Sequence, residues 1–379
     1  MDLRHLWGLD PSVDFLNHGS FGAAPLKIRQ LQLVLQKELE SQPVEFLARR
    51  LPERLLQVRR RLGLFLGADP ARLALIPNAS TGVATVLNSF DWREGDEVVL
   101  ADHAYNAVRR SIAYLGHRYG VREALATVPF PLQEAGQIVE AFARAIGPPT
   151  RLILVDHITS ATALVFPVAE IIALGRQRGI PVLVDGAHAP GSLHLELDRL
   201  GADFYTGNLH KWVCTPKGSA FLYVAPAWRD RVHPLVISHG YGAGFEAEFD
   251  WIGTADPSPW LCIPAALEFQ EGLGWEQTRA YNHALVMEGR ELLAHALGVK
   301  APIPDDRRLS VGMAVVPFPG RALPGVQQAL NARMYKEHRI EVPFTAYDDR
   351  LWLRVSAQRY NHLDQYRRLA KVLASGWPG

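Results

Sequence analysis

Short runs of consecutive apolar residues alternate along the chain with segments in which apolar residues recur every three or four positions. Residues 151–157 (RLILVDH) and 180–188 (IPVLVDGAH) are continuous apolar runs, which is typical of strands covered on both faces. Residues 168–179, between them, repeat apolar positions at helical spacing and end on a glycine. A strand, a helix and a second strand in this order predict a right-handed parallel crossover.

The same alternation continues on both sides of this unit. Residues 203–208 (DFYTGN) and 219–226 (SAFLYVAP) are two further apolar strand candidates. Upstream, residues 73–80 (LALIPNAS) lead from a strand into a helix, and residues 94–110 repeat that step. The chain is therefore predicted to contain an α/β domain with a mostly parallel sheet.

The last third of the chain has a different pattern. Residues 308–318 (RLSVGMAVVPF) and 349–358 (DRLWLRVSAQ) alternate polar and apolar positions, as half-buried strands do. Residues 362–376 predict a terminal amphipathic helix. A smaller α+β domain is expected from about residue 260, after a turn-rich stretch at 253–259.

Composition and charge add several exclusions. The chain has 40 Lys and Arg against 39 Asp and Glu, so its charge gives no reason to expect nucleic acid or an anionic membrane as a partner. Its two cysteines, Cys214 and Cys262, cannot build a disulfide framework. No uncharged apolar run reaches the roughly 18 residues of a membrane helix, and the N-terminus has no signal-peptide pattern. A cytoplasmic protein is expected, and no metal site is predicted.

Chemically useful side chains follow two successive predicted strands. Asp185 ends one strand and Lys211 follows the next, and ligands of open parallel sheets bind at such strand ends. A carboxylate there can hold a ring nitrogen in its protonated form. A lysine among apolar neighbours has its charged form disfavoured, so its amine becomes a better nucleophile. With a helix N-terminus at residues 78–81 (NAST) to cradle a phosphate, the set suits pyridoxal phosphate.

Each of these features also has an ordinary structural interpretation. Asp185 could cap a loop, Lys211 could lie on the surface, and residues 78–81 could be a plain helix N-cap. Their joint occurrence at successive strand ends favours the cofactor site. Structural roles, such as capping a strand end or packing in the core, are expected for Asp156, His157, His194 and Cys214.

Four stretches carry a family resemblance: residues 15–25 (FLNHGSFGAAP), 42–50 (QPVEFLARR), 184–191 (VDGAHAPG) and 205–212 (YTGNLHKW). The chain resembles fold-type-I pyridoxal phosphate enzymes of the class V aminotransferase and cysteine desulfurase group, and within it the isopenicillin N epimerase-like branch. The resemblance covers nearly the whole chain. It implies the PLP-dependent transferase fold, with a large domain around a mostly parallel sheet of seven-stranded type and a smaller C-terminal α+β domain.

The resemblance also implies a division of the chain and roles for the strand-end residues. Residues 1–20 would line the substrate site, residues 21–258 would form the PLP-binding domain, and residues 259–379 would form the small domain. The further roles concern four side chains. Lys211 would bind the cofactor covalently and move the Cα proton, Asp185 would pair with the pyridine nitrogen, and His188 and Ser160 would lie near the ring hydroxyl.

Other positions match the rest of the cofactor site of this family. His103 matches the residue that stacks on the cofactor ring, although Tyr105 is close enough in sequence to be the stacking residue instead. Asn208 stands where desulfurases have a phosphate-binding serine, which leaves its own role open. The remaining matches, at the phosphate loop and beside the lysine, are Ala79, Ser80, Thr81 and His210.

Substrate binding and assembly follow from further matches. Arg354 matches the arginine that grips the substrate α-carboxylate as a bidentate fork, and its alternative is a surface arginine on an edge strand. Asn17 and His18 would line the substrate entrance. Thr254 matches a residue that reaches the phosphate of the neighbouring subunit in relatives, which implies a homodimer with shared active sites.

The absence of a cysteine in one segment narrows the set of possible reactions. Desulfurases carry a cysteine on a loop shortly before the carboxylate arginine, and residues 336–350 contain none. We therefore expect an epimerase or racemase acting at the Cα–H of an amino acid or an amino-acid-containing substrate. The alternatives are a β-eliminating C–S lyase on a cysteine conjugate, an aminotransferase, and a cofactor-binding protein without turnover.

Overall fold

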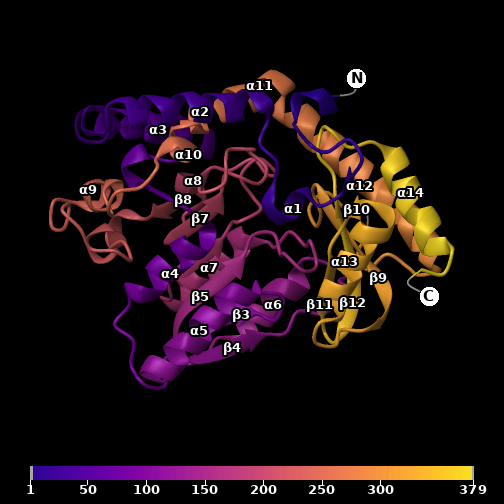
Figure 1. Ribbon diagram of the computed structural model, residues 1–379. Coiled ribbons are helices and arrows are strands. Elements are labelled where there is room, and N and C mark those ends of the chain that lie inside the picture. Colours follow the sequence, from indigo (N-terminus) through magenta and orange to yellow (C-terminus); the bar gives the residue numbers. More distant parts are fainter. Residues whose placement is uncertain (1–2, 305, 378–379) are drawn as a thin grey trace.

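The centre of the molecule is a seven-stranded sheet in the order β2-β8-β7-β6-β5-β3-β4 (Figure 1). The computed structural model describes residues 3–304 and 306–377. All strands of this sheet except β8 run in the same direction, which confirms the predicted mostly parallel sheet. The strands are β2 (Leu73–Ile76), β3 (Glu97–Ala101), β4 (Arg122–Ala126), β5 (Thr150–Asp156), β6 (Val182–Asp185), β7 (Phe204–Asn208) and β8 (Ala220–Val224).

Helices cover both faces of this sheet. One face packs against α3, α6, α7 and α11, and the other against α4, α5 and α9. The continuous apolar runs of β5 and β6 follow from this, because side chains that point to either face are removed from water. These helices are α3 (Leu51–Leu66), α4 (Ala79–Asn88), α5 (Asn106–Tyr119), α6 (Gly136–Ala145), α7 (Val168–Arg178), α9 (Phe245–Asp250) and α11 (Ile263–Leu273).

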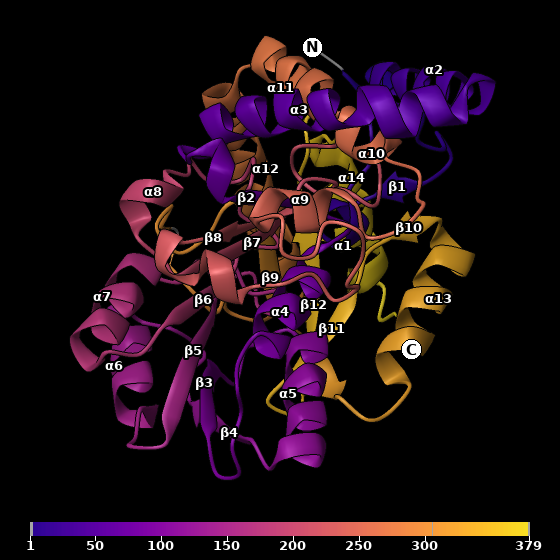
Figure 2. The same ribbon diagram turned by 90° about the vertical axis from the view of Figure 1, so that its left-hand side faces the viewer.

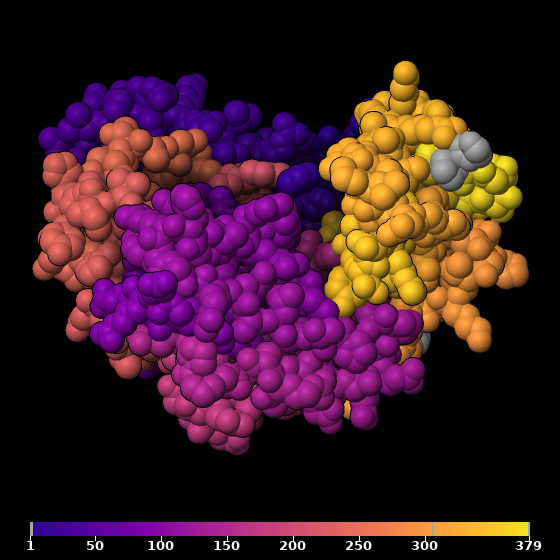
Figure 3. Space-filling model, turned by 90° about the horizontal axis from the view of Figure 1, so that it is seen from below, coloured from indigo at the N-terminus to yellow at the C-terminus, as the bar shows by residue number. Residues whose placement is uncertain are grey.

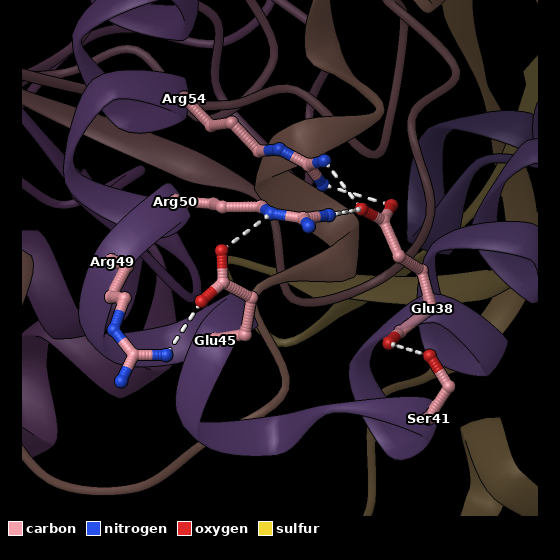
Figure 4. A network of polar contacts seen from close by, with 6 residues as sticks. All are labelled: Glu38, Ser41, Glu45, Arg49, Arg50 and Arg54. Atoms are coloured by element: carbon pink, nitrogen blue, oxygen red, sulfur yellow. Dashed lines mark hydrogen bonds and ion pairs between the residues drawn. The ribbon is translucent and has the colours of Figure 1, made fainter.

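The N-terminal elements lie along one side of the sheet, where α2 and α3 run as two long helices (Figures 1 and 2). A π-helical turn, η2, lies between them. Its Arg49 and Arg50, together with Arg54 of α3, pair with Glu45 of η2 and Glu38 of α2 (Figure 4). The guanidinium groups of this segment therefore already have acidic partners. The elements are η1 (Arg4–Leu6), β1 (Asp14–Phe15), α1 (His18–Phe21), α2 (Leu26–Ser41), η2 (Glu45–Arg50) and η3 (Pro70–Arg72).

The C-terminal part is built on a three-stranded antiparallel sheet in the order β11-β12-β9, which α12 and α14 cover. Its strands are β9 (Met313–Arg321), β11 (Phe344–Tyr347) and β12 (Arg350–Ser356). The short helix α8 (Leu197–Leu200) precedes β7. The remaining elements follow β8 and are η4 (Pro226–Arg231), α10 (Ser258–Leu261), α12 (Trp275–Leu297), α13 (Val326–His338), β10 (Ile340–Glu341) and α14 (Leu363–Ala374).

The expectation that these C-terminal strands are half-buried was wrong. β12 is the central strand of its sheet, and its residues are buried from Leu351 to Ser356. Leu353 and Val355 face α12 and α14, whereas Trp352 belongs to the core of the large sheet. Both faces are therefore covered, and the next side chain on the Trp352 face, Arg354, points toward the large sheet.

The N-terminal segment is attached to this C-terminal sheet. β1 pairs in parallel with β10, and the Ser356 N–H donates to the carbonyl of Leu16 at 2.9 Å. This pairing carries α1 to the junction between the two sheets. The predicted boundaries after residues 20 and 258 stay a prediction. Within the described ranges, no helix is both long enough and apolar enough to cross a membrane.

Candidate active site

Lys211 lies just past the end of β7, with its amine close to a histidine. Its Nζ is 3.1 Å from Nε2 of His188. Burial lowers the pKa of the Lys211 amine to about 7; the positive charge of Arg354 adds to this effect and Asp185 opposes it. At neutral pH a large share of this amine is therefore uncharged and able to act as a nucleophile or a base.

His188 helps to keep the lysine in this state. It is buried, and burial lowers its pKa well below the usual value, with the charge of Lys211 adding to the effect. The indole N–H of Trp212 donates to Nδ1 of His188 at 3.5 Å. A neutral imidazole that accepts at Nδ1 carries its proton on Nε2, which faces the Lys211 amine. This arrangement suits a neutral lysine.

Asp185 ends β6 and is buried at the same edge of the sheet. Its Oδ1 accepts the backbone N–H of Ala187 at 2.9 Å. Burial raises the pKa of the Asp185 carboxyl, and the charge of Lys211 opposes the rise. A buried carboxylate with few donors is the group that a protonated ring nitrogen would satisfy.

The N-terminus of α4 lies at the same strand ends. Asn78 caps it by accepting the Thr81 N–H at 2.9 Å, and Asn208 accepts the Ala79 N–H at 2.9 Å. Asn208 therefore holds the first turn of α4 in place, which gives the residue whose role was open a structural task. Ser80 is exposed, and among the described groups neither its N–H nor its hydroxyl has a hydrogen-bond partner. An anion fits there, because helix N-termini favour negative charge.

These groups fit pyridoxal phosphate. The lysine amine, the buried carboxylate and the free donors of a helix N-terminus converge on one edge of the sheet. They are the groups required by an aldehyde, a pyridine nitrogen and a phosphate, respectively. No group of three or more His, Cys, Asp or Glu side chains that could hold a metal ion is present within the described part of the chain.

Arg354 approaches the site from β12. Its Nη1 donates to the backbone carbonyl of Ser160 at 2.6 Å and to the Ser160 hydroxyl at 3.2 Å, and its Nη2 donates to the Ser20 hydroxyl at 2.8 Å. Only 4% of Arg354 is exposed, its Nε has no partner, and burial lowers its pKa to about 10. Among the described residues it makes no ion pair. The alternative of a surface arginine on an edge strand was therefore wrong, and a buried cation bonded only to neutral oxygens is suited to an anionic ligand.

Asn17 reaches this arginine through a relay. Its Oδ1 accepts the hydroxyl of Ser20 at 2.6 Å, and its Nδ2 donates to Glu341 at 3.2 Å. Ser20 in turn accepts from Arg354. Asn17 therefore helps to orient the Arg354 guanidinium through Ser20, and the roles of both residues in substrate binding stay predictions.

His18 does not lie at the substrate entrance where we expected it. It is fully buried, its Nε2 is 2.9 Å from the backbone carbonyl of Lys211, and its Nδ1 is 2.7 Å from the hydroxyl of Tyr360. Burial lowers its pKa to about 3. Both ring nitrogens thus have protein partners, and His18 supports the lysine from behind.

Gly22 brings the N-terminal segment against the lysine. Its φ is +67°, and a Cβ there would lie 2.1 Å from the carbonyl oxygen of His210 and 2.8 Å from the Cα of Lys211. No side chain fits in this approach without moving the backbone that holds the lysine.

Gly22→Ala is expected to destabilise the protein by more than the ~1–3 kcal/mol that a left-handed backbone costs a residue with a side chain. Gly244→Ala is the matched control, because Gly244 also combines a positive φ (+104°) with an extended ψ (163°) and has nothing within 4 Å of its Cβ position. Urea unfolding of both variants measures the difference. Equal losses of unfolding free energy would show that the contact with Lys211 does not matter.

His103 is held in a defined orientation beside β12's sheet. Its Nδ1 is 2.7 Å from the hydroxyl of Thr162, and its ring stacks on Tyr347 with centroids 4.0 Å apart. Burial lowers its pKa to about 4, so the imidazole is neutral at pH 7. Tyr105, the alternative ring-stacking residue, is 46% exposed at the start of α5. Which of the two stacks on the cofactor stays a prediction.

The other predicted positions fall in three surroundings. Ser160 accepts from Arg354, as described above. His210 is buried, with Nδ1 3.2 Å from the carbonyl of Ser219, and burial lowers its pKa to about 4. Thr254 lies in an exposed loop, where its proposed contact with a second subunit stays a prediction.

A cavity of about 830 Å³ adjoins Ser160, which bonds Arg354. Ser160, Tyr105 and His103 line it from the large sheet, and residues 344–349 line it from the C-terminal sheet. Figure 3 shows the C-terminal strands meeting the segment around residues 100–160 at a hollow in the surface. The space is larger than the side chain of a small amino acid requires.

The family follows from a model that matches most of the chain. The family described as Aminotransferase class-V matches residues 33–339. The chain belongs to the aminotransferase class-V family. Membership of this family confirms the cofactor expected from the sequence, pyridoxal 5′-phosphate. The lysine amine, the buried carboxylate and the helix N-terminus described above are groups that this cofactor requires.

Relatives of this class-V chain carry two kinds of name. It is 35% identical to an isopenicillin N epimerase of Streptomyces clavuligerus, over 96% of this chain and 95% of that protein. It is 33% identical to a putative L-cysteine desulfhydrase 1 of Oryza sativa subsp. japonica, over 97% of this chain and 85% of that protein. The resemblance to the isopenicillin N epimerase-like branch is thereby confirmed.

The fold of the class-V chain matches a solved structure of the same type. A C-DES variant with glycine covalently linked to the PLP cofactor superposes with a TM-score of 0.81 at 22% identity, covering 99% of each chain. This similarity confirms the PLP-dependent transferase fold expected from the sequence.

The sequence reasoning missed the importance of Asp156. This residue ends β5 directly beside Asp185, and it is buried with one carboxyl oxygen unpartnered. The sequence shows that both strands are apolar runs that end on aspartate, but the register that places the two aspartates side by side is visible only in the structure.

Proposed function

We propose that this class-V enzyme removes the Cα proton of an amino acid or of a peptide-like substrate that contains one, and that it returns the proton to the opposite face as an epimerase or racemase. The observation that carries the proposal is the Lys211 amine, whose pKa burial and the charge of Arg354 lower to about 7, and whose Nζ lies 3.1 Å from Nε2 of His188. An amine in this state is a base at neutral pH.

The residues divide the work as follows. When bound, pyridoxal phosphate withdraws electrons from the Cα of an amino acid joined to it, which makes the Cα–H acidic. Asp185 keeps a negative charge where the ring nitrogen would lie. Arg354 holds the substrate carboxylate, and Lys211 takes the proton at Cα. His188 orients the lysine amine, so the base is set before the substrate arrives.

The size of the cavity beside Ser160 and Arg354 supports a substrate with a long side chain. The cavity of about 830 Å³ is lined by Ser160, which bonds the Arg354 guanidinium, and by residues of β11. A carboxylate on Arg354 would leave the rest of a peptide-like substrate in this space. Independently of the cavity, the 35% identity to an isopenicillin N epimerase favours epimerisation.

The second candidate is β-elimination from a cysteine conjugate. Its support is the 33% identity to a putative L-cysteine desulfhydrase, together with 24% identity to a hercynylcysteine sulfoxide lyase of Schizosaccharomyces pombe. Both reactions begin when Lys211 removes the Cα proton, so they share every residue named above. Transamination and cofactor binding without turnover are the remaining alternatives from the sequence.

Persulfide chemistry of the cysteine-loop desulfurase type is not part of the proposal. The segment 336–350 has no cysteine. Cys214 and Cys262 are both buried, and burial raises the pKa of each thiol to about 12. A buried thiol with a raised pKa is a poor nucleophile, which supports the exclusion.

The test is a product assay with two readouts on one panel. The holoenzyme is incubated with L-amino acids, short peptides with a free α-amino acid end and S-substituted cysteines. Chiral chromatography reports epimerisation, and pyruvate with released thiol or sulfide reports elimination. The proposal expects inversion of at least one substrate, whereas pyruvate formation without any inversion would replace it with the lyase.

A homodimer in the cytoplasm is proposed with this function. Exposed apolar side chains gather in the N-terminal helices and in the loop before α9, as a subunit contact would require. They include Leu33, Val34, Val44, Leu235, Val236, Ile237 and Tyr241. Thr254 lies a few residues after α9.

A further inference from the structure

Two strands of the large sheet end on aspartates that lie in register. Asp156 on β5 pairs with Asp185 on β6. Neighbouring strands lie about 4.8 Å apart, and residues in register on parallel strands point to the same face. Two residues earlier, Leu154 and Leu183 both pack in the core beneath α4 and α5. The two carboxyl groups therefore lie side by side on that face.

The two carboxyl groups differ in their partners. Asp185 accepts the Ala187 N–H and feels the positive charge of Lys211. The backbone N–H groups of Tyr105 and of Asp156 itself act to lower the pKa of the Asp156 carboxyl, and among the described residues its Oδ2 has no partner. Only 3% of Asp156 is exposed, and within residues 3–304 and 306–377 the one charged side chain that acts on it is Asp185.

Two buried carboxylates at this spacing cannot both be ionised, because each makes the charge of the other more costly. Burial raises the pKa of Asp156 well above its usual value, and the negative charge of Asp185 adds to the rise. Asp185 has a cation and an N–H donor to stabilise its charge, and Asp156 has no cation. The proton therefore belongs on Asp156, whose free oxygen then carries an O–H to donate.

We propose that Asp156 is a positioning residue that keeps a proton and donates it in a hydrogen bond to the Asp185 carboxylate. The pair then holds one proton and one negative charge. That charge stays on Asp185, the member that would face a protonated ring nitrogen. The inference rests on the cofactor role proposed for Asp185, and it departs from the expectation that Asp156 caps a strand end.

Apart from Asp185, the titratable side chains around Asp156 face or act on other groups. His157, next along β5, points to the opposite face, where its Nδ1 is 2.8 Å from the hydroxyl of Tyr205. Lys211 acts on Asp185 and is not among the groups that act on Asp156. The phenol of Tyr105 acts on Arg354, and only its backbone reaches Asp156.

The first test compares cofactor binding in two variants. Without the donated hydrogen bond, the pKa of buried Asp185 rises further, and each unit above the working pH costs about tenfold in its ionised fraction. Asp156→Leu is expected to weaken the binding of pyridoxal phosphate to the apoprotein by at least about tenfold. Asp156→Asn keeps an N–H donor and should bind at least about tenfold more tightly than the leucine variant.

The second test follows the apoprotein alone. An aspartate of the unfolded chain loses its proton near pH 4, whereas folded Asp156 keeps it. Folding then takes up a proton, so the stability of the wild type falls with rising pH relative to Asp156→Asn. The difference in urea midpoint, asparagine variant minus wild type, should grow from about pH 4 upward. Thr206→Val, at the other register neighbour of Asp185, should give a profile parallel to the wild type.

The outcomes separate this inference from the proposed function. Asp185→Asn is measured in parallel. If Asp185→Asn lowers cofactor affinity but Asp156→Leu does not, the inference is wrong and the role of Asp185 stands. If Asp185→Asn binds the cofactor like the wild type, the role of Asp185 itself fails. An asparagine variant as weak as the leucine variant, or a stability difference that does not change with pH, would also overturn the inference.

Discussion

Lys211→Ala is expected to abolish both the covalent attachment of the cofactor and turnover. A large share of the Lys211 amine is neutral at pH 7, because its pKa is lowered to about 7, and a histidine lies 3.1 Å away. General acid–base catalysis alone contributes about 10²–10⁴-fold, so kcat should fall by at least this factor. Borohydride reduction followed by mass spectrometry of the peptide around residue 211 measures the attachment.

Lys217→Ala is the matched control for this change. Lys217 lies in the same segment, and its Nζ donates to the carbonyl of Gly22 at 3.0 Å. Its loss should leave the covalent attachment in place, even where it lowers stability. Cofactor that stays covalently attached in Lys211→Ala would refute the assignment of the lysine.

Arg354→Ala is expected to raise KM for every substrate with a free α-carboxylate. The arginine is buried and bonded only to neutral oxygens of Ser160 and Ser20. Loss of one partner from a buried, hydrogen-bonded charge pair costs about 2–5 kcal/mol, which corresponds to a rise in KM of at least about thirtyfold. Because the contact with Arg354 would also set the orientation of Cα, kcat should fall as well.

Substrates and a neighbouring arginine provide the controls. Arg350 begins the same strand but is exposed, so Arg350→Ala should leave KM near the wild-type value. A substrate amide that lacks the carboxylate should have about the same KM with Arg354→Ala as with the wild type. An unchanged KM for the carboxylate substrate would mean that another group holds it.

The residues that the sequence identified best are those fixed by the local pattern. β5 and β6 are continuous apolar runs because helices cover both faces of the sheet, and Asp185 stands at the end of such a run. Lys211 stands out because apolar and aromatic residues surround it. In these cases the signal and its cause lie within a few residues of each other.

The sequence could not supply the parts that depend on distant segments. Arg354 was identified from a resemblance, and its burial follows from the packing of β12 between two cores. His18 was expected at the substrate entrance, but the β1–β10 pair turns it toward the backbone of Lys211. Asp156 acquires its significance only from the register of β5 with β6, which no local pattern states.

Hydrogen exchange at Cα tests the central claim most directly. The holoenzyme and its Lys211→Ala variant are incubated in deuterated water with the substrates of the product assay, and NMR or mass spectrometry follows deuterium at Cα. For any substrate that is inverted, we predict deuterium at Cα with the wild type and none above background with the variant. Inverted product formed by the wild type without deuterium at Cα would contradict removal of the Cα proton by Lys211.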